Sequence, residues 1–556
     1  MGDVLIDDLV KQEDRVATIN RLRRLVKFYL DSNHTESAMF WADKAASISD
    51  SPCDYYWLAQ CMFRSGEYQR AAYLIKSKHL DQDQPLFQWL AGLCLLEAKK
   101  YDEALLVLSG DCENISAINS SNSASSAFIL NIPAITTNHI LEGFTPETLR
   151  SALLTLKGRI YEKLDRKPCA LECYKQALKC DVFCYEAFQA ITKHQMLSAS
   201  EEKELMDSLQ FKSQCSNPGL LPFVYEQLLK KYQKLTPSEL QLCSFNHNLG
   251  LLGNLDLKAA RAERLLYDCA FKQSYALTVD ILKADTFHKL GLQVHIACLV
   301  QLKKHSALFY LAHQLVDTYP SRAVTWYAVG CYYLVIGKLI TARTYLGKAV
   351  YIDKCFGPAW LAYGHSLAKE NEHDQAMAAY LSATKVMRGC HLPLMYVGTS
   401  CGLINNLKLA ERFLTQAHSI MPSDPFVIHE LGTIAYQNAD FKVAEQYFLK
   451  ALEEVRKRDK HIICDKWEPL LNNLGHTYRK LKNYDEALGY HHHALSILPK
   501  NPSTLTSIGF VQALQGKFVE AIESFHKVLT WKKDDSFSLT MLPYLIQQYE
   551  FVTPSK

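Results

Sequence analysis

The sequence predicts an all-α fold, a superhelix of stacked helix pairs of the tetratricopeptide repeat type. Glycines recur 34 residues apart in two runs, first Gly330, Gly364, Gly398 and Gly432, and then Gly475 and Gly509. An alanine follows each glycine after 12 residues, at Ala342, Ala376, Ala410, Ala444, Ala487 and Ala521. Six matches at one period exclude a chance pattern.

Each repeat has the composition that a pair of antiparallel helices needs. A glycine on the first helix and alanines on the second let the two backbones approach, and bulky side chains fill the space that is left. Proline ends the second helix in two units, at Pro422 and Pro499. The bulky positions are Trp326, Tyr333, Trp360, Tyr380, Phe448, Tyr478 and Phe525.

Weaker copies of the pattern extend towards the N-terminus and define the expected organisation. Gly158 with Ala170 marks a clear unit, and residues 262–286 resemble a degenerate one. Three further units are marked by Val26 with Ala38, Ala59 with Ala71, and Gly92 with Ala104. We therefore predict an extension at 1–19, a first array at 20–210 with a Ser- and Asn-rich insertion at 111–147, an irregular linker at 211–260, a second array at 261–535 and a capping helix with a tail at 536–556.

Charge and cysteine content exclude several classes of function. Lys and Arg total 61 and Asp and Glu total 58, a balance that does not suit binding to a nucleic-acid backbone. The 17 cysteines include no CxxC pair, so zinc-ribbon and redox motifs lack their ligand spacing, and reduced thiols inside the cell are expected. Residues Ala323–Gly337 are uncharged but too few to span a bilayer, which needs about 20 residues. We expect neither a nucleic-acid nor a membrane partner.

Three consecutive histidines, His491 to His493, raise the question of a metal site. Consecutive side chains on a helix diverge by about 100° and do not converge on one ion. His491 also falls on the repeat position that holds Tyr380, Phe448 or Phe525 in other units. The run is therefore interpreted as packing, with no metal ligand.

Catalytic motifs are absent from the sequence. The segment HELGT at 429–433 lacks the second histidine of a zinc-protease motif, and neither a GxSxG motif nor a phosphate-binding loop is present. We expect no catalytic residue and no cofactor.

The first helices of stacked pairs line the concave side of such an array, so the repeat phase predicts a groove. Positions three before, two before, one after and four after the glycine should face it. Mixed amide, hydroxyl and aromatic groups there suit an extended or helical peptide, although each alone could be a solvated residue on an empty face. Asn472 and Asn473 favour binding most, because two amides have low propensity within a helix. The predicted groove residues are Tyr327, Cys331, Leu334, His365, Thr399, His429, Thr433, Tyr436, Asn472, Asn473, His476, Arg479 and Phe510.

Several segments outside the repeat consensus resemble one particular family, the cell division cycle sixteen subunits of the anaphase-promoting complex. They include YYWLAQC at 55–61, AVGCYYL at 328–334, GCHLPLMYVG at 389–398 and DKWEPLLNNLGH at 465–476. The resemblance runs from about residue 20 to about residue 545.

This resemblance implies a non-catalytic scaffold subunit of a ubiquitin ligase that controls mitosis and G1. It also implies a homodimer formed through the N-terminal repeats, contacts with other repeat subunits, and a small accessory subunit of the cell division cycle protein twenty-six type in the C-terminal groove. The implied location is the nucleus and cytoplasm, including the spindle. The alternatives are a repeat adaptor or co-chaperone, and the recruiting array of an enzyme.

Overall fold

The chain is helical in all the parts that the structure describes, so the predicted fold class is confirmed. The computed structural model describes residues 2–109, 145–193, 196–215, 219–229, 253–458 and 465–552, and no strand occurs in those ranges. They form two compact units, one of Met1–Lys193 and Lys203–Pro222 and one of His194–Glu202 and Phe223–Lys556.

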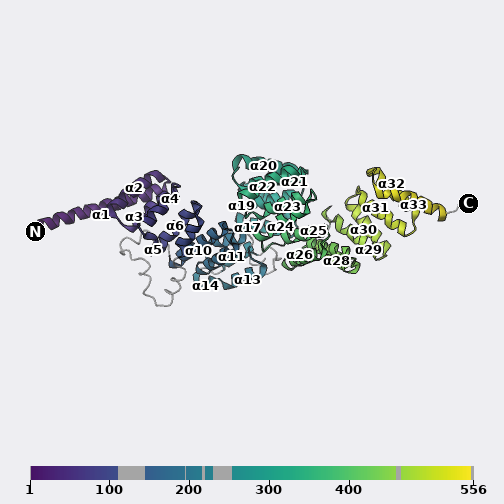
Figure 1. The fold of residues 1–556 in the computed structure, drawn as a ribbon, viewed down its shortest axis with the longest axis horizontal. Coiled ribbons are helices and arrows are strands. Elements are labelled where there is room, and N and C mark those ends of the chain that lie inside the picture. Colours follow the sequence, from purple (N-terminus) through teal and green to yellow (C-terminus); the bar gives the residue numbers. More distant parts are fainter. Residues whose placement is uncertain are drawn as a thin grey trace. The chain divides into compact units, whose positions relative to one another are not determined.

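The first unit begins with a long helix that crosses the predicted boundary at residue 19, and antiparallel neighbours follow it (Figure 1). Two helices, α13 (Ala199–Ser208) and α15 (Leu220–Leu229), span the division between the units. The helices of the first unit are α1 (Gly2–Asp31), α2 (Thr35–Ser49), α3 (Pro52–Arg64), α4 (Tyr68–Ser77), α5 (Leu80–Asp83), α6 (Pro85–Glu97), α7 (Tyr101–Ser109), α10 (Pro146–Lys163), α11 (Lys167–Cys180), α12 (Tyr185–Lys193) and α14 (Phe211–Gln214).

The second unit is a succession of helix pairs in which each odd-numbered helix packs against the even-numbered helix that follows it (Figure 1). The pairs are α17 (Leu255–Tyr267) and α18 (Phe271–Ala284), α19 (Lys289–Gln301) and α20 (His305–Thr318), α21 (Ala323–Ile336) and α22 (Leu339–Ile352), α23 (Gly357–Ala368) and α24 (His373–Val386), α25 (His391–Leu403) and α26 (Leu407–Ile420), α27 (Pro425–Gln437) and α28 (Phe441–Arg458), α29 (Glu468–Lys480) and α30 (Tyr484–Ile497), and α31 (Pro502–Leu514) and α32 (Phe518–Trp531). A 3₁₀ turn, η4 (Asp465–Trp467), precedes α29, and α33 (Ser536–Val552) ends the array.

The repeat glycines lie where the two helices of a pair come closest. A Cβ placed on Gly432 would stand 2.6 Å from the ring of Phe448, and one on Gly398 would stand 2.7 Å from Leu414. The contacted residue is 16 positions after the glycine in each case. His491 holds this place opposite Gly475, so its predicted role in packing is confirmed.

A residue in the left-handed conformation ends the first helix of each repeat, seven positions after the glycine. Its φ is +91° at Gly337, +63° at Asn371 and +66° at Ala439. The next amide bonds back to the final turn, as Lys338 N does to Tyr333 O at 3.0 Å, which satisfies a carbonyl at the helix end. The same conformation recurs in the weak units, at Asn33, Gly66, Lys99 and Cys269, so their phase is confirmed.

Parts of the predicted insertion and linker lie outside the described residues, at 110–144, 216–218 and 230–252. Four of the nine extra residues between Gly432 and Gly475 lengthen α28 to 18 residues, against 14 in α26, and 459–464 again lie outside the described part. Within the described ranges, no helix has the length and apolarity to cross a membrane. The same ranges hold no group of three or more His, Cys, Asp or Glu side chains able to hold a metal ion.

Candidate peptide-binding cavity

The second unit contains a cavity of about 630 Å³ on the inner side of its helix pairs. The first helices of six consecutive pairs line it, from α17 to α27, and Lys466 completes the wall. Most of the lining side chains are apolar, including Leu266, Val294, Leu361 and Met395. The cavity therefore offers an apolar interior, with few polar positions that would orient a ligand.

Five of the thirteen predicted groove residues line this cavity, namely Tyr327, Cys331, Leu334, His365 and Thr399. The first three are only 6%, 2% and 5% exposed, so they form a closed wall of α21 and do not face an open groove. The repeat phase correctly predicted which side of α21 these three residues occupy, but it did not predict how deeply they are buried.

Burial favours the neutral form of three side chains that line the cavity, Tyr327, Cys331 and His365. Desolvation raises the pKa of Cys331 to about 12 and raises that of Tyr327 well above its ordinary value. Desolvation, with a smaller contribution from Lys369, lowers the pKa of His365 to about 4, and Nδ1 of this ring lies 2.8 Å from the Tyr380 hydroxyl. Neutral hydrogen-bonding groups in an apolar wall suit an uncharged segment of a ligand.

A buried hydrogen bond between a histidine and a carboxylate fixes one end of the cavity. Nε2 of His391 lies 2.8 Å from Oδ2 of Asp424, and the two side chains are 1% and 2% exposed. The other carboxylate oxygen of Asp424 accepts the backbone N–H of Phe426 at 3.0 Å, so it also caps α27. One carboxylate thus ties the start of α25 to the start of α27.

The other eight predicted residues continue along α27, α29 and α31 beyond the cavity. The Asn473 amide nitrogen lies 2.9 Å from Nε2 of His429, which links two successive first helices. The Arg479 guanidinium lies over the ring of Phe510 at 5.0 Å from its centroid. Thr433 donates its hydroxyl to the Glu430 carbonyl, and the ring of Tyr436 packs edge-on against Phe441.

Asn472 makes its polar contacts within the protein. Its amide nitrogen donates to Thr504 Oγ1 at 2.9 Å and to the Glu468 carboxylate, and its Oδ1 lies 3.0 Å from Nδ1 of His491. These contacts join α29 to α30 and α31. They give the first asparagine of the pair a second explanation, as a structural link between repeats.

The three-histidine run is divided by the helix. His491 is fully buried and packs 5.0 Å from the ring of His476, whereas His492 is exposed. Desolvation, followed by the charges of neighbouring groups, lowers the pKa of His476 to about 4 and that of His491 to about 3. The three rings do not converge on one point.

Sequence reasoning missed several residues of the cavity wall although the repeat phase contained them. Applied to every unit, including the degenerate ones, the same four positions identify Glu263, Leu266, Gln293, Val294, Ala297, Val300, Leu361, Ala362, Met395 and Tyr396, all of which line the cavity. Only Lys466 and the residues at helix ends, such as Cys269, Phe271 and Asp424, follow no repeat position.

Known proteins share this architecture along almost the whole chain. The chain is 47% identical to the Cell division cycle protein 16 homolog of Mus musculus, over 95% of its own length and 84% of that relative. It is 35% identical to Anaphase-promoting complex subunit 6 of Arabidopsis thaliana, over 95% and 96% of the two chains. The chain belongs to the cell division cycle protein 16 family.

Further matches agree with membership of this family, the subunit 6 family of the anaphase-promoting complex. The described fold is similar to a chain in the crystal structure of the APC/C hetero-tetramer Cut9–Hcn1, with a TM-score of 0.80, 29% identity, and coverage of 95% and 96% of the two chains. Residues 31–110 match the family described as anaphase-promoting complex, cyclosome, subunit 3, and residues 469–501 match the tetratricopeptide repeat.

Proposed function

We propose that this chain is a non-catalytic scaffold subunit of the anaphase-promoting complex, a ubiquitin ligase that controls mitosis and G1. Its second unit would bind the N-terminal segment of a small accessory subunit of the cell division cycle protein twenty-six type. The cavity is the observation that supports this most directly, since the first helices of six pairs line a space whose mostly apolar wall, with a few polar and charged groups, suits a peptide. The similarity to a chain of the Cut9–Hcn1 complex supports the same partner.

The residues beyond the cavity would accept the continuation of that peptide. Asn473, His476 and Arg479 follow one another on α29 at helical spacing, and Phe510 lies beside Arg479 on α31. Amides and imidazoles there can bond to a peptide backbone, and the ring offers an apolar contact. All thirteen predicted groove residues thus remain proposed peptide contacts, with Asn472 also acting within the fold.

The first unit would form the homodimer. Large apolar side chains of α1, α2, α4 and α7 are exposed there, namely Phe28, Phe40, Tyr73 and Leu106. Exposed apolar groups of this size suit a protein interface. Other repeat subunits of the complex, and a location in the nucleus and cytoplasm including the spindle, belong to the same proposal and can be tested by affinity purification and imaging in dividing cells.

Blocking the cavity tests the accessory-subunit proposal. Ala297 of α19 lines the cavity, and Ala297→Trp should weaken binding of a synthetic accessory-subunit peptide by at least about tenfold, or ~1.4 kcal/mol, because the indole occupies its space. Calorimetry with the full chain measures the affinity. Thr344→Trp on the exposed face of α22 is the matched control, and equal affinities for both variants would contradict the proposed site.

A further inference from the structure

The two ends of the cavity wall are joined by contacts between residues far apart in the sequence. In a repeat array each unit normally contacts only its neighbours. Here Arg458, at the end of α28, reaches Asp268 in the turn between α17 and α18, and the two positions are 190 residues apart. The sixth helix pair of the second unit therefore closes back on the first.

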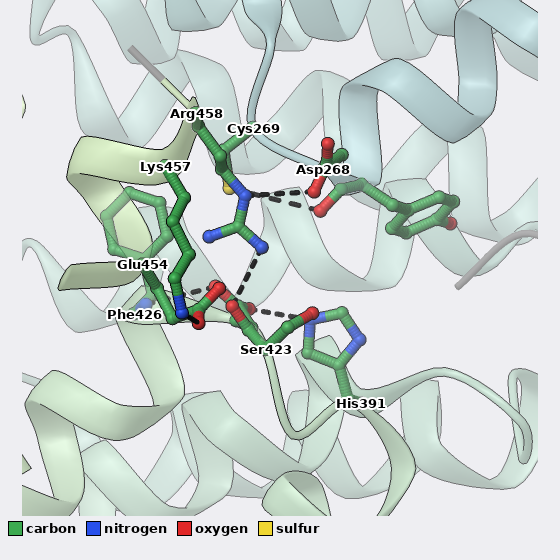
Figure 2. Close-up of polar contacts among 10 residues, drawn as sticks. Asp268, Cys269, His391, Ser423, Phe426, Glu454, Lys457 and Arg458 are labelled. Atoms are coloured by element: carbon green, nitrogen blue, oxygen red, sulfur yellow. Dashed lines mark hydrogen bonds and ion pairs between the residues drawn. The ribbon is translucent and has the colours of Figure 1, made fainter. Parts of the chain in front are cut away.

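The Arg458 guanidinium lies between Asp268 and Ser423, which belong to two different turns, as Figure 2 shows. Its Nε donates to Asp268 Oδ1 at 2.9 Å, and its Nη2 donates to the Ser423 carbonyl at 2.7 Å. The side chain of Arg458 is 10% exposed and that of Asp268 is 35% exposed. An ion pair at this depth is screened by water less than a surface pair.

Lys466 makes a second connection on the other side of residues 459–464. Its ammonium donates to Oε1 of Gln301 at 2.5 Å and lies 3.9 Å from the centre of the Phe271 ring. Gln301 ends α19 and Phe271 begins α18, so this lysine also joins η4 to the first two pairs. Lys466, Phe271 and Gln301 line the cavity directly.

A third contact lies beside the ion pair. Tyr267, which precedes Asp268, packs edge-on against His391 with 6.4 Å between ring centroids. Both residues line the cavity, and Asp268 holds Arg458 immediately next to them. Opening the Asp268–Arg458 pair would therefore free the wall of the cavity at the place where its two ends meet.

We propose that Asp268, Phe271, Gln301, Arg458 and Lys466 form a clasp that keeps the helix pairs closed around a bound peptide and sets its dissociation rate. The proposal rests on the proposed function, since it concerns the residence time of that ligand. A peptide enclosed by six pairs leaves when the ring opens, and opening breaks these contacts. Arg458 is a positioning residue in this scheme and does not touch the peptide.

Dissociation kinetics of the full chain test the clasp. A fluorescent peptide of the accessory subunit's N-terminal segment is bound and then chased with unlabelled peptide. Arg458→Met and Asp268→Asn should each release it about tenfold faster or more, with little decrease in association rate. The double variant should be no faster than Arg458→Met, because both changes remove one interaction. Raising the salt concentration should speed release from the parent chain more than from Arg458→Met.

Lys457→Met is the matched control, because Lys457 is the preceding residue, is half exposed and, among the described residues, forms its ion pairs along its own helix with Glu453 and Glu454. Release from this variant should match that from the parent chain. If circular dichroism shows that both variants are folded and the peptide dissociates from Arg458→Met and Lys457→Met at the same rate, the clasp is overturned. The proposal that the peptide binds in the cavity would still stand.

Hydrogen exchange separates failure of the clasp from failure of the proposed function. Without peptide, Arg458→Met should speed amide exchange at the start of α18, and Lys457→Met should not. If the parent chain binds no peptide, the proposed function fails, and unchanged exchange in Arg458→Met would remove the clasp as well.

Discussion

At the scale of single residues, the close approach of the two helices of a pair depends on a glycine, which has no side chain to keep them apart. Phe448 is buried and lies 2.6 Å from the Cβ position of Gly432, whereas the equally buried Phe525 lies 3.2 Å from the Cβ position of Gly509. The same repeat position thus tolerates a methyl group differently in different units. Gly489, on the outer side of α30, has no atom within 4 Å of its Cβ position.

Alanine substitutions should separate these cases. Gly432→Ala should destabilise the second unit by about 1–3 kcal/mol, because the methyl group overpacks against the Phe448 ring. Gly489→Ala should stabilise it by about 0.5–1 kcal/mol, since alanine favours the helix and meets nothing there. Denaturant unfolding measures both. A Gly432→Ala variant as stable as the parent would contradict the packing described for α27 and α28.

At the scale of elements, α29 and α30 are joined by polar groups where other pairs use a leucine or an aromatic ring. His491 stands in the place of Phe448 and Phe525, and its Nδ1 bonds to Asn472 of the first helix. The pKa of this ring is lowered because burial penalises its charged form, so the ring is neutral in the folded protein at neutral pH. The pair of helices should therefore be sensitive to acid.

The direction in which stability changes with pH follows from the lowered pKa of His491. The pKa of His491 is lowered to about 3 in the folded protein, against about 6.5 when unfolded, so the unfolded chain binds more protons below pH 6.5. Stability should fall from about pH 6.5 towards pH 3, by about 1–2 kcal/mol between pH 7 and pH 5. His491→Phe should flatten this dependence in denaturant unfolding, and the exposed His492→Phe should not. Identical pH slopes for all three proteins would refute the assignment.

At the scale of the whole molecule, the two units have separate tasks in the proposed function. The second unit contains the cavity, and the first presents apolar side chains at its surface. An exposed set of this kind is stabilised when a second copy covers it.

Self-association is accordingly expected to reside in residues 1–210. Sedimentation velocity at micromolar concentration should show a dimer of this segment and of the full chain, and Tyr73→Glu should shift the full chain towards monomer by placing a charge in the contact. Thr344→Trp, in the second unit, should leave the dimer unchanged. A purely monomeric full chain under these conditions would argue against the homodimer.

The sequence by itself determined the repeat, because a 34-residue period must place the same side chains at every close approach of two helices. It therefore predicted the fold class, the packing of His491 and the side of α21, α23 and α25 that faces the cavity. The family resemblance was also visible in segments such as GCHLPLMYVG.

Only the tertiary structure decided how far the array closes. The rotation between successive pairs is the sum of many small packing contacts, and no single residue encodes it. The closure that this rotation produces is seen in contacts between residues far apart in the sequence. Asp268 contacts Arg458, and Gln301 contacts Lys466. The structure also decided that Asn472 bonds to Glu468, Thr504 and His491, because these contacts depend on how adjacent helices pack and not on the repeat phase.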